Sequence, residues 1–234
     1  MNYKIIPIPS EQTKDWLLYK HYAHRVPPIM FAFGLYNERK ELQGICTFGM
    51  PCVQMNDGKC IFENEFRVRT LELNRLVINE GLEKNVLSFF LGQCLKLLPK
   101  PLCLVSFADP NNGHNGYIYQ ATNWLYAGLS EKGGKNKDYL FNDRNYHGKT
   151  ITIQWFRDNG FNYDSTKTLP ENFELIGGEV RDFGLKHRYL MFLGNRKQTK
   201  EMRENLGYQI LPYPKGENKR YDASYKPKIN GVLF

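Results

Sequence analysis

The chain has 234 residues, of which 41% are hydrophobic and 24% are charged, and this balance excludes a disordered or fibrous protein. It contains no apolar run of about 18 residues and no apolar signal-peptide core near its start, so we expect a cytoplasmic protein without a membrane span. Its five cysteines include no CxxC pair, which argues against a zinc knuckle or a disulfide framework.

The net charge of +8 is concentrated near the end of the chain. Residues 181–234 carry twelve lysines and arginines against five acidic residues, with five tyrosines between them. Clustered cations with interleaved aromatic rings are typical of contact with a phosphate backbone and exposed bases. A solvated basic surface without a nucleic-acid partner is the alternative.

The first half of the chain predicts strands followed by a helix. Residues 30–36 and 42–48 are strand-like and flank a polar turn, which predicts an antiparallel hairpin. Residues 66–78 predict another extended segment. Residues 86–98 predict a helix because their apolar residues recur at three- and four-residue spacing, and the prolines that follow end it.

The second half continues this alternation with less regular patterns. Residues 102–107 predict a buried strand and residues 116–126 a second helix, while residues 131–138 have the composition of a mobile polar loop. Residues 149–156 and 187–193 are late strand candidates. We therefore expect one α/β domain over residues 1–194, with a basic extension over residues 195–234.

A polar turn follows the strand at residues 102–107. The strand ends abruptly at Asp109-Pro110, and the surrounding segment supplies hydroxyl, carboxyl, amide and imidazole groups. Functional groups at the carboxyl end of a strand commonly form a ligand site, although Asp109 could also serve only as a turn cap. The candidates are Ser106, Asp109, Asn112, His114 and Tyr119.

Two further segments carry groups suited to chemistry. His21 and His24 would share one face if residues 16–24 are helical, and they would then suit metal binding, acid-base catalysis or a surface role. Arg75 lies in an apolar strand, so we expect it to meet Glu72, Asp109 or an anionic ligand. The loop at residues 79–85 precedes a helix start and could receive an anion.

Several separated blocks resemble the phage Mom family of DNA-modification proteins, which carries a GNAT-type acyltransferase core. The resemblance covers roughly residues 15–195 and implies a mixed, mostly antiparallel sheet flanked by helices. The blocks are Lys20-His21-Tyr22-Ala23-His24-Arg25, Gly44-Ile45-Cys46-Thr47-Phe48-Gly49, Glu72-Leu73-Asn74-Arg75-Leu76, Val105-Ser106-Phe107-Ala108-Asp109-Pro110, residues 113–122 and Lys186-His187-Arg188-Tyr189.

The resemblance implies a transferase that alters the exocyclic amine of adenine in duplex DNA, giving a carbamoylmethyl-type adduct that protects phage DNA from restriction. It implies that the reaction centre is formed by His21, Tyr22, Arg75, Ser106, Asp109 and Tyr119. An acyl-CoA or another acyl or aminoacyl donor would be held around Val77, Asn79, Gly81, Asn85 and Ser88. A bound iron is compatible with the family, and its available ligands would be His21, Asp109 and His114.

In this hypothesis the basic extension docks double-stranded DNA through Arg196, Lys197, Lys200, Arg203, Lys219 and Arg220. The target adenine is flipped into the pocket, Tyr22 or Tyr119 stacks on it, and Asp109 or His21 takes the amine proton. Arg75 and Ser106 stabilise negative charge on the donor. The sequence leaves open whether the chain is a monomer or a homodimer.

Three other functions remain open. The same fold would support a CoA-dependent N-acetyltransferase acting on a protein, a small amine or another modified base. A DNA-binding accessory module would use only the basic extension. A nuclease would have to use His114, Asn115 and His147, whose spacing matches no metal-nuclease pattern.

Overall fold

The computed structural model describes residues 2–52, 55, 58, 60–110, 113–130, 137–142, 144–182 and 184–216. The chain forms two compact units: Met1–Leu129 together with Lys186–Phe234, and Ser130–Leu185. The predicted boundary after residue 194 lies within the first unit. The second unit is an insertion that the sequence pattern did not indicate.

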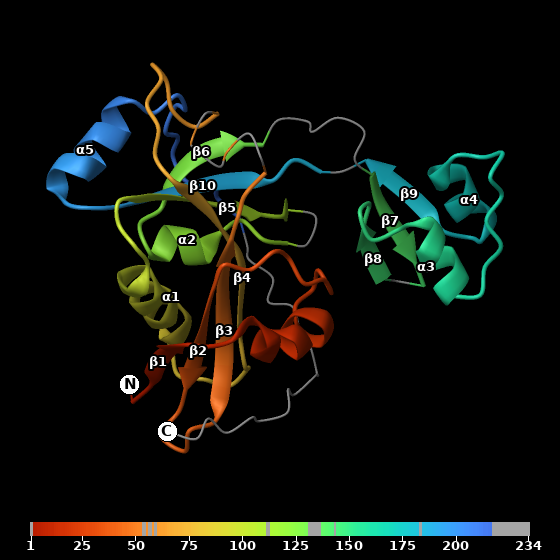
Figure 1. The fold of residues 1–234 in the computed structure, drawn as a ribbon, viewed down its shortest axis with the longest axis horizontal. Helices are drawn as coiled ribbons and strands as arrows, with labels where there is room; N and C mark the ends of the chain where they lie inside the picture. Colours follow the sequence, from red (N-terminus) through yellow and green to blue (C-terminus); the bar gives the residue numbers. More distant parts are fainter. Residues whose placement is uncertain are drawn as a thin grey trace. The chain divides into compact units, whose positions relative to one another are not determined.

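The first unit is built on a seven-stranded sheet with the strand order β1-β2-β3-β4-β5-β10-β6 (Figure 1). All neighbouring strands are antiparallel except β4 and β5, which are parallel. The predicted fold class, a mixed and mostly antiparallel sheet with flanking helices, is confirmed. The strands are β1 Lys4–Pro7, β2 Phe31–Tyr36, β3 Leu42–Gly49, β4 Thr70–Ile78, β5 Leu102–Ala108, β6 Leu125–Leu129 and β10 His187–Leu193.

The parallel pair β4 and β5 is joined over only a short stretch. Its register runs from Thr70 opposite Cys103 to Glu72 opposite Val105, and beyond that point the two strands pair no further among the described residues. β4 continues to Ile78 along β3, and β5 continues to Ala108 along β10. The strands therefore separate after Glu72, and side chains occupy the space that a continued ladder would close.

Helices cover both faces of this sheet. On one face, α1 (Val86–Leu97) and α2 (Tyr117–Ala121) pack on an apolar cluster that includes Leu71, Leu104 and Phe90 (Figure 1). On the opposite face, η1 (Ser10–Thr13) and the π-helix η2 (Trp16–Lys20) pack over β2, β3 and β4. On that same face, α5 (Arg196–Glu204) inserts Met202 into a cluster over β5, β10 and β6.

Most predicted elements of the first unit are confirmed. The hairpin appears as β2 and β3, the extended segment as β4, and the amphipathic helix as α1. The strand after it appears as β5, and the late strand at residues 187–193 as β10.

The predicted helix over residues 116–126 is wrong beyond Ala121. Asn123 adopts a left-handed backbone with φ 61°, which a helix cannot continue through. Leu125 then begins β6, where it pairs with Leu190.

The second unit contains a small antiparallel sheet with the order β8-β7-β9. Its strands are β7 Lys137–Phe141, β8 Arg144–His147 and β9 Glu179–Asp182, and its helices are α3 Ile153–Asp158 and α4 Leu169–Leu175. The predicted strand over residues 149–156 is wrong, because Thr152 caps α3 by accepting a hydrogen bond from the Trp155 amide. Most of the predicted loop at residues 131–138 lies outside the described residues, and its last two residues belong to β7.

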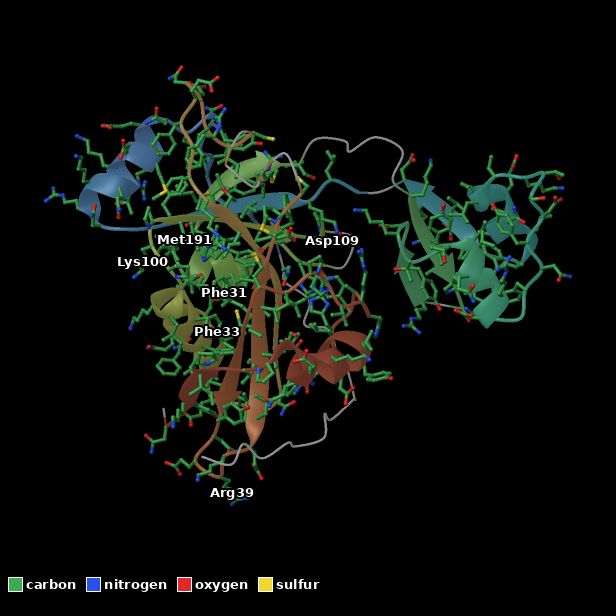
Figure 2. The ribbon with its side chains drawn as sticks, in the orientation of Figure 1. Phe31, Phe33, Arg39, Lys100, Asp109 and Met191 are labelled. Atoms are coloured by element: carbon green, nitrogen blue, oxygen red, sulfur yellow. The ribbon has the colours of Figure 1, made fainter. Side chains whose placement is uncertain are left out.

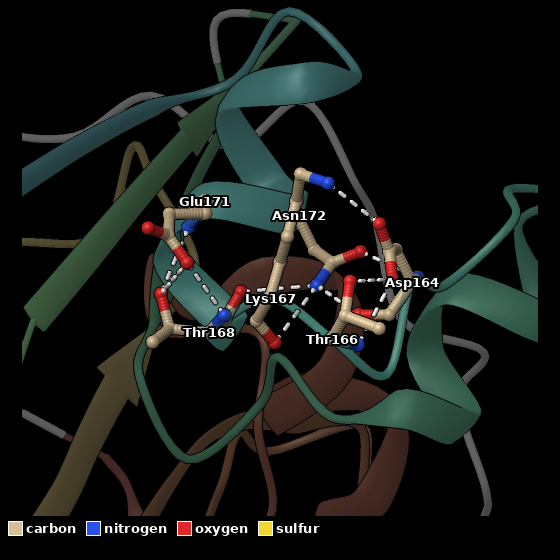
Figure 3. Close-up of polar contacts among 6 residues, drawn as sticks. All are labelled: Asp164, Thr166, Lys167, Thr168, Glu171 and Asn172. Carbon is tan, nitrogen blue, oxygen red and sulfur yellow. Dashed lines mark hydrogen bonds and ion pairs between the residues drawn. The ribbon is translucent and has the colours of Figure 1, made fainter.

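This unit has its own aromatic core and a capped helix. Tyr139, Phe156 and Phe173 are buried together among further aromatic rings. Thr168 and Glu171 form a capping box at the start of α4, and the buried Asn172 side chain bonds the preceding turn (Figure 3). These satisfied polar groups and the separate core are what a compact unit requires.

Among the helices of the described residues, none is long and apolar enough to cross a bilayer. Cys46, Cys94 and Cys103 are buried thiols, and no disulfide joins the cysteines of the described residues.

Candidate active site

The point where β4 and β5 separate is filled by a hydrogen-bonded pair of hydroxyls. Ser106 on β5 is buried, and its Oγ lies 2.7 Å from both the Leu73 carbonyl oxygen and the Tyr119 hydroxyl. A carbonyl can only accept, so the single Ser106 proton goes to Leu73 and the Tyr119 hydroxyl donates to Ser106. Both predicted site residues are therefore brought together, but the Ser106 proton is already used within the protein.

An aromatic cluster holds Tyr119 in place. Its ring lies 5.2 Å from the ring of Trp124 and 5.0 Å from that of Tyr189. The Tyr189 hydroxyl donates to the Asn115 carbonyl and accepts from Gln120. Gly116, with φ +78°, passes so close to the Tyr189 ring that a Cβ atom there would overlap it. Only glycine meets both conditions at this position.

The loop after η2 brings His21 and Tyr22 to the site. η2 ends at Lys20, and His21 has an extended ψ of 133°. His21 and His24 therefore do not share a helical face, and that prediction is wrong. The His24 ring turns back to the Leu18 carbonyl at 2.8 Å, whereas His21 stacks on Tyr22 with ring centroids 4.3 Å apart.

The His21 ring presents a defined tautomer. Its Nδ1 accepts a hydrogen bond from the Ala23 amide at 3.0 Å, so in the neutral ring the proton resides on Nε2. Burial lowers the pKa of His21 well below its ordinary value, and the charge of Arg75 lowers it further. The imidazole is thus neutral and a hydrogen-bond donor, which disfavours the proposed role as proton acceptor.

Lys20 anchors this loop to the far end of β4. Lys20 is buried, and its Nζ lies 2.7 Å from the carboxylate of Glu80, two residues beyond the end of β4. The ion pair ties the end of η2 to the strand that carries Arg75.

Tyr22 is a protonated phenol near several charges. Burial raises the pKa of Tyr22 to about 12, and the negative charge of Asp109 contributes to the rise. The Tyr22 ring also lies 5.2 Å from the His114 ring. Burial raises the pKa of Tyr119 as well. Both tyrosines are therefore hydrogen-bond donors near neutral pH.

Glu72 and Arg75 face this site from β4 without pairing to each other. The Arg75 guanidinium donates to the Asn74 carbonyl, while its Nε is buried and makes no hydrogen bond. Among the described residues, no carboxylate oxygen lies within 4 Å of Arg75, and the Glu72 carboxylate makes no hydrogen bond or ion pair. Of the alternatives for Arg75, a protein carboxylate is excluded within the described residues, and an anionic ligand remains.

Burial shifts the pKa of each group in the direction that favours its neutral form. It raises the pKa of Glu72 above the ordinary carboxyl value, although the charges of Arg75 and Lys186 oppose the rise. It lowers the pKa of Arg75, which nonetheless remains charged near neutral pH. Two oppositely charged side chains that are not paired to each other can both contact one ligand that carries a hydrogen-bond donor and an acceptor.

Asp109 is buried just beyond the end of β5 and has a cationic partner that the sequence analysis did not place in the site. Lys186 Nζ lies 3.2 Å from Asp109 Oδ2, and the Asp109 carbonyl accepts from the His114 amide. Lys186 precedes β10, whose first residue pairs with Ala108, so strand register carries it to Asp109. Its place in the Lys186-His187-Arg188-Tyr189 block was the only sequence signal.

The site does not fit a metal ion. In the part of the chain that the structure describes, no group of three or more His, Cys, Asp or Glu side chains is placed to hold one. His21 Nδ1 is already used by the Ala23 amide, and Asp109 is paired with Lys186. The expectation of an iron ligated by His21, Asp109 and His114 is thus not supported.

The predicted donor-binding residues extend from the end of β4 to the first turn of α1, and their side chains differ in how far they are used within the protein. Val77 is buried in the core, and Asn79 bonds Gln43 through both its amide groups. Gly81 and Asn85 have left-handed backbones, and the Ser88 hydroxyl donates to the Asn85 carbonyl. The side chains of Val77 and Asn79 are therefore already used within the protein.

The predicted DNA-contact residues on α5 are exposed. Arg196, Lys197, Lys200 and Arg203 all face solvent, and Lys200 lies 3.5 Å from Glu204. Asn112, Lys219 and Arg220 lie outside the described residues, as does the side chain of His147.

Comparisons with known proteins point in one direction. The model of the Mom protein family matches residues 2–215. The methylcarbamoylase mom of Escherichia phage Mu is 26% identical over 201 residues, which cover 84% of this chain and 77% of that protein.

Two solved structures share part of the fold. NAA60 of Arabidopsis thaliana, in complex with a bisubstrate analogue, has a TM-score of 0.46 and 9% identity, covering 82% of this chain and 98% of that one. A GNAT family N-acetyltransferase from Escherichia coli, in complex with CoA, has a TM-score of 0.38 and 10% identity, covering 53% and 69%. These low scores describe a partial likeness of fold only.

Proposed function

Because this chain belongs to the Mom protein family, we propose that it is a transferase that modifies the exocyclic amine of adenine in duplex DNA. The relative from Escherichia phage Mu is named a methylcarbamoylase, which supports a carbamoylmethyl-type adduct, and such an adduct would protect phage DNA from restriction. The observation that carries the proposal is the convergence of His21, Tyr22, Arg75, Asp109 and Tyr119 where β4 and β5 separate.

The substrate geometry requires the base to leave the duplex. The adenine amine is paired in the helix, so the nucleotide is flipped before its nitrogen can react. Tyr22 is the better of the two predicted stacking residues, because the Tyr119 ring is packed between Trp124 and Tyr189. Tyr119 and Ser106 then act as positioning residues that border the site.

The charges at the separation of β4 and β5 suit transfer to an amine. The adenine nitrogen forms a bond to the donor carbon, the donor's leaving group departs, and the amine loses one proton. Glu72 accepts that proton more readily than His21, which presents Nε2–H, or Asp109, which is paired with Lys186. Arg75 stabilises negative charge that develops on the donor oxygen.

The donor in this proposal is an acyl-CoA or another acyl or aminoacyl compound. Its anionic part would meet backbone amides around Gly81, Asn85 and Ser88, which precede or begin α1. Val77 is buried in the core and Asn79 bonds Gln43, so both residues hold the loop in place.

Mass spectrometry of nucleosides tests the proposal directly. Plasmid DNA co-expressed with the protein should yield a modified deoxyadenosine, and unmodified deoxyadenosine with a soluble, folded protein would contradict the function. Asp109→Ala should lower the yield strongly, whereas Asp158→Ala, an exposed aspartate in the second unit, should not. Acetyl transfer to peptides or small amines without any DNA product would instead favour an N-acetyltransferase.

A further inference from the structure

Arg188 is a buried cation on β10 that the proposed reaction does not use. The residue is 5% exposed, and its Nε makes no hydrogen bond. Among the described residues, no carboxylate oxygen lies within 4 Å of its guanidinium. Burying a guanidinium without a counter-charge is costly, so a buried cation with no ion pair among the described residues indicates a ligand that supplies the charge.

The surroundings of Arg188 are apolar and aromatic. Its register partner on β5 is Phe107, and the next residues on the same face of β10, Leu190 and Phe192, belong to the apolar core. The guanidinium carbon lies 4.2 Å from the centre of the Tyr208 ring. Stacking uses the flat face of a guanidinium and leaves its N–H groups, which lie in the plane, able to donate.

Tyr208 connects this cation to the basic helix. It follows α5 after a short turn, which is held by the Glu63 amide bonding to Asn205 and the Gly207 amide bonding to Ile61. The basic side chains of α5 face solvent a few residues earlier in the chain. The anion that meets Arg188 would therefore arrive at the same part of the molecule as one attracted by α5.

We propose that Arg188, held by the ring of Tyr208, binds a backbone phosphate of the DNA substrate. Planar guanidinium groups bind phosphate oxygens through two parallel hydrogen bonds, and such charge-assisted bonds are stronger than neutral ones. This inference rests on the proposed function for the identity of the anion. The contact positions the duplex and reads no sequence.

The test compares Arg188→Met with Arg188→Lys and with the matched control Arg39→Met. Arg39 is exposed in the turn between β2 and β3, at the end of the first unit away from Asp109 (Figure 2). Binding of an unmodified duplex oligonucleotide is measured at several salt concentrations, and unfolding of each variant is followed in the same buffers. Donor binding is measured separately with the acyl donor that supports modification.

Arg188→Met should weaken duplex binding about tenfold and reduce the magnitude of the salt slope by about 1, uniformly across sequences. Its stability should be equal to or higher than that of the wild type, because the substitution removes a buried charge that has no ion pair among the described residues. Arg188→Lys should lie between the wild type and Met in affinity. Arg39→Met should leave affinity unchanged.

Several outcomes would overturn the inference. One is wild-type affinity and salt slope in Arg188→Met; another is weaker donor binding with DNA binding intact. If Arg188→Met does not fold, then wild-type DNA affinity in a folded Arg188→Lys protein overturns the stacked-phosphate contact. A wild-type protein that binds DNA without modifying it contradicts the proposed function and leaves this binding test in force, while one that binds no DNA overturns the inference.

Discussion

Two groups of polar side chains meet where β4 and β5 separate, and they are satisfied to different degrees. The first group consists of Ser106, Tyr119 and Tyr189, and each of their hydroxyls has a hydrogen-bond partner within the protein. In the second group, Glu72 and Arg75 are close enough to shift each other's pKa but form no ion pair.

This difference distinguishes side chains that stabilise the fold from side chains that are available to a ligand. A buried polar group that is bonded within the protein contributes to stability, whereas one left unbonded lowers stability and is kept where a ligand will meet it. Substitutions in the first group should therefore affect mainly folding. Substitutions in the second group should affect mainly turnover.

The largest effect is expected for Arg75→Gln. Removing the cation that faces the developing charge should lower adenine modification about 10³-fold, with no loss of folding stability. Modification is measured by nucleoside mass spectrometry and stability by thermal unfolding, with Arg39→Gln as the matched control. An inactive Arg75 variant that is also strongly destabilised would place Arg75 in the first group instead.

Glu72→Gln should lower modification about 10²-fold, because the amide cannot accept a proton. In the wild type the acidic limb of kcat/KM should lie above the ordinary carboxyl range, since burial raises the pKa of Glu72 and only the ionised form is active. The pH profile from acidic to neutral conditions checks this. An unchanged acidic limb in the variant would exclude Glu72 as the proton acceptor.

Glu72→Gln should also change how folding stability depends on pH, in a direction that the pKa shift of Glu72 defines. Because the folded-state pKa of Glu72 is raised, the folded protein holds the proton more tightly than the unfolded chain, and stability falls as pH rises from the unfolded to the folded pKa. Glu72→Gln removes this fall. The variant should be more stable than the wild type at neutral pH and no more stable at strongly acidic pH.

Gly116→Ala tests the first group. The added methyl would overlap the Tyr189 ring in a backbone conformation with φ +78°, so the free energy of unfolding should fall by about 2–4 kcal/mol. Gly160→Ala is the control, because it has a similar φ with open space around it. Equal losses in the two variants would show that the contact with Tyr189 contributes nothing.

The smallest effect is expected for Ser106→Ala. The Tyr119 hydroxyl would lose its acceptor, which should lower stability by about 1–3 kcal/mol while modification falls less than tenfold. Adding Tyr119→Phe should restore part of the stability, since both partners are then apolar. A loss of modification as large as that of Arg75→Gln would instead assign Ser106 to the chemistry.

The sequence predicted the elements whose pattern is local. The hairpin of β2 and β3 and the helix α1 follow from alternation and from three- and four-residue spacing, and the strand β5 from its apolar run. The same spacing misled at residues 116–126, because Leu125 fits both a continued helix and the strand it actually begins. The missed signal for α3 was a threonine able to cap it.

The site was predicted by residue type and resemblance, and its pairings were not. Nothing near Asp109 in the sequence indicates that Lys186 will lie beside it, because strand register makes that contact. The same holds for Ser106 with the Leu73 carbonyl, where only the separation of two parallel strands brings the atoms together. Partners contributed by distant strands are set by topology.

The insertion of the second unit between β6 and β10 also constrains the order of assembly. β5 is bordered on one side by a three-residue ladder to β4 and on the other by β10 along its whole length. During synthesis, residues 130–185 leave the ribosome before β10 does. The strand that carries Ser106 can therefore pair with β10 only after residues 130–185 have been synthesised. Residues 187–193 then complete the sheet late in translation.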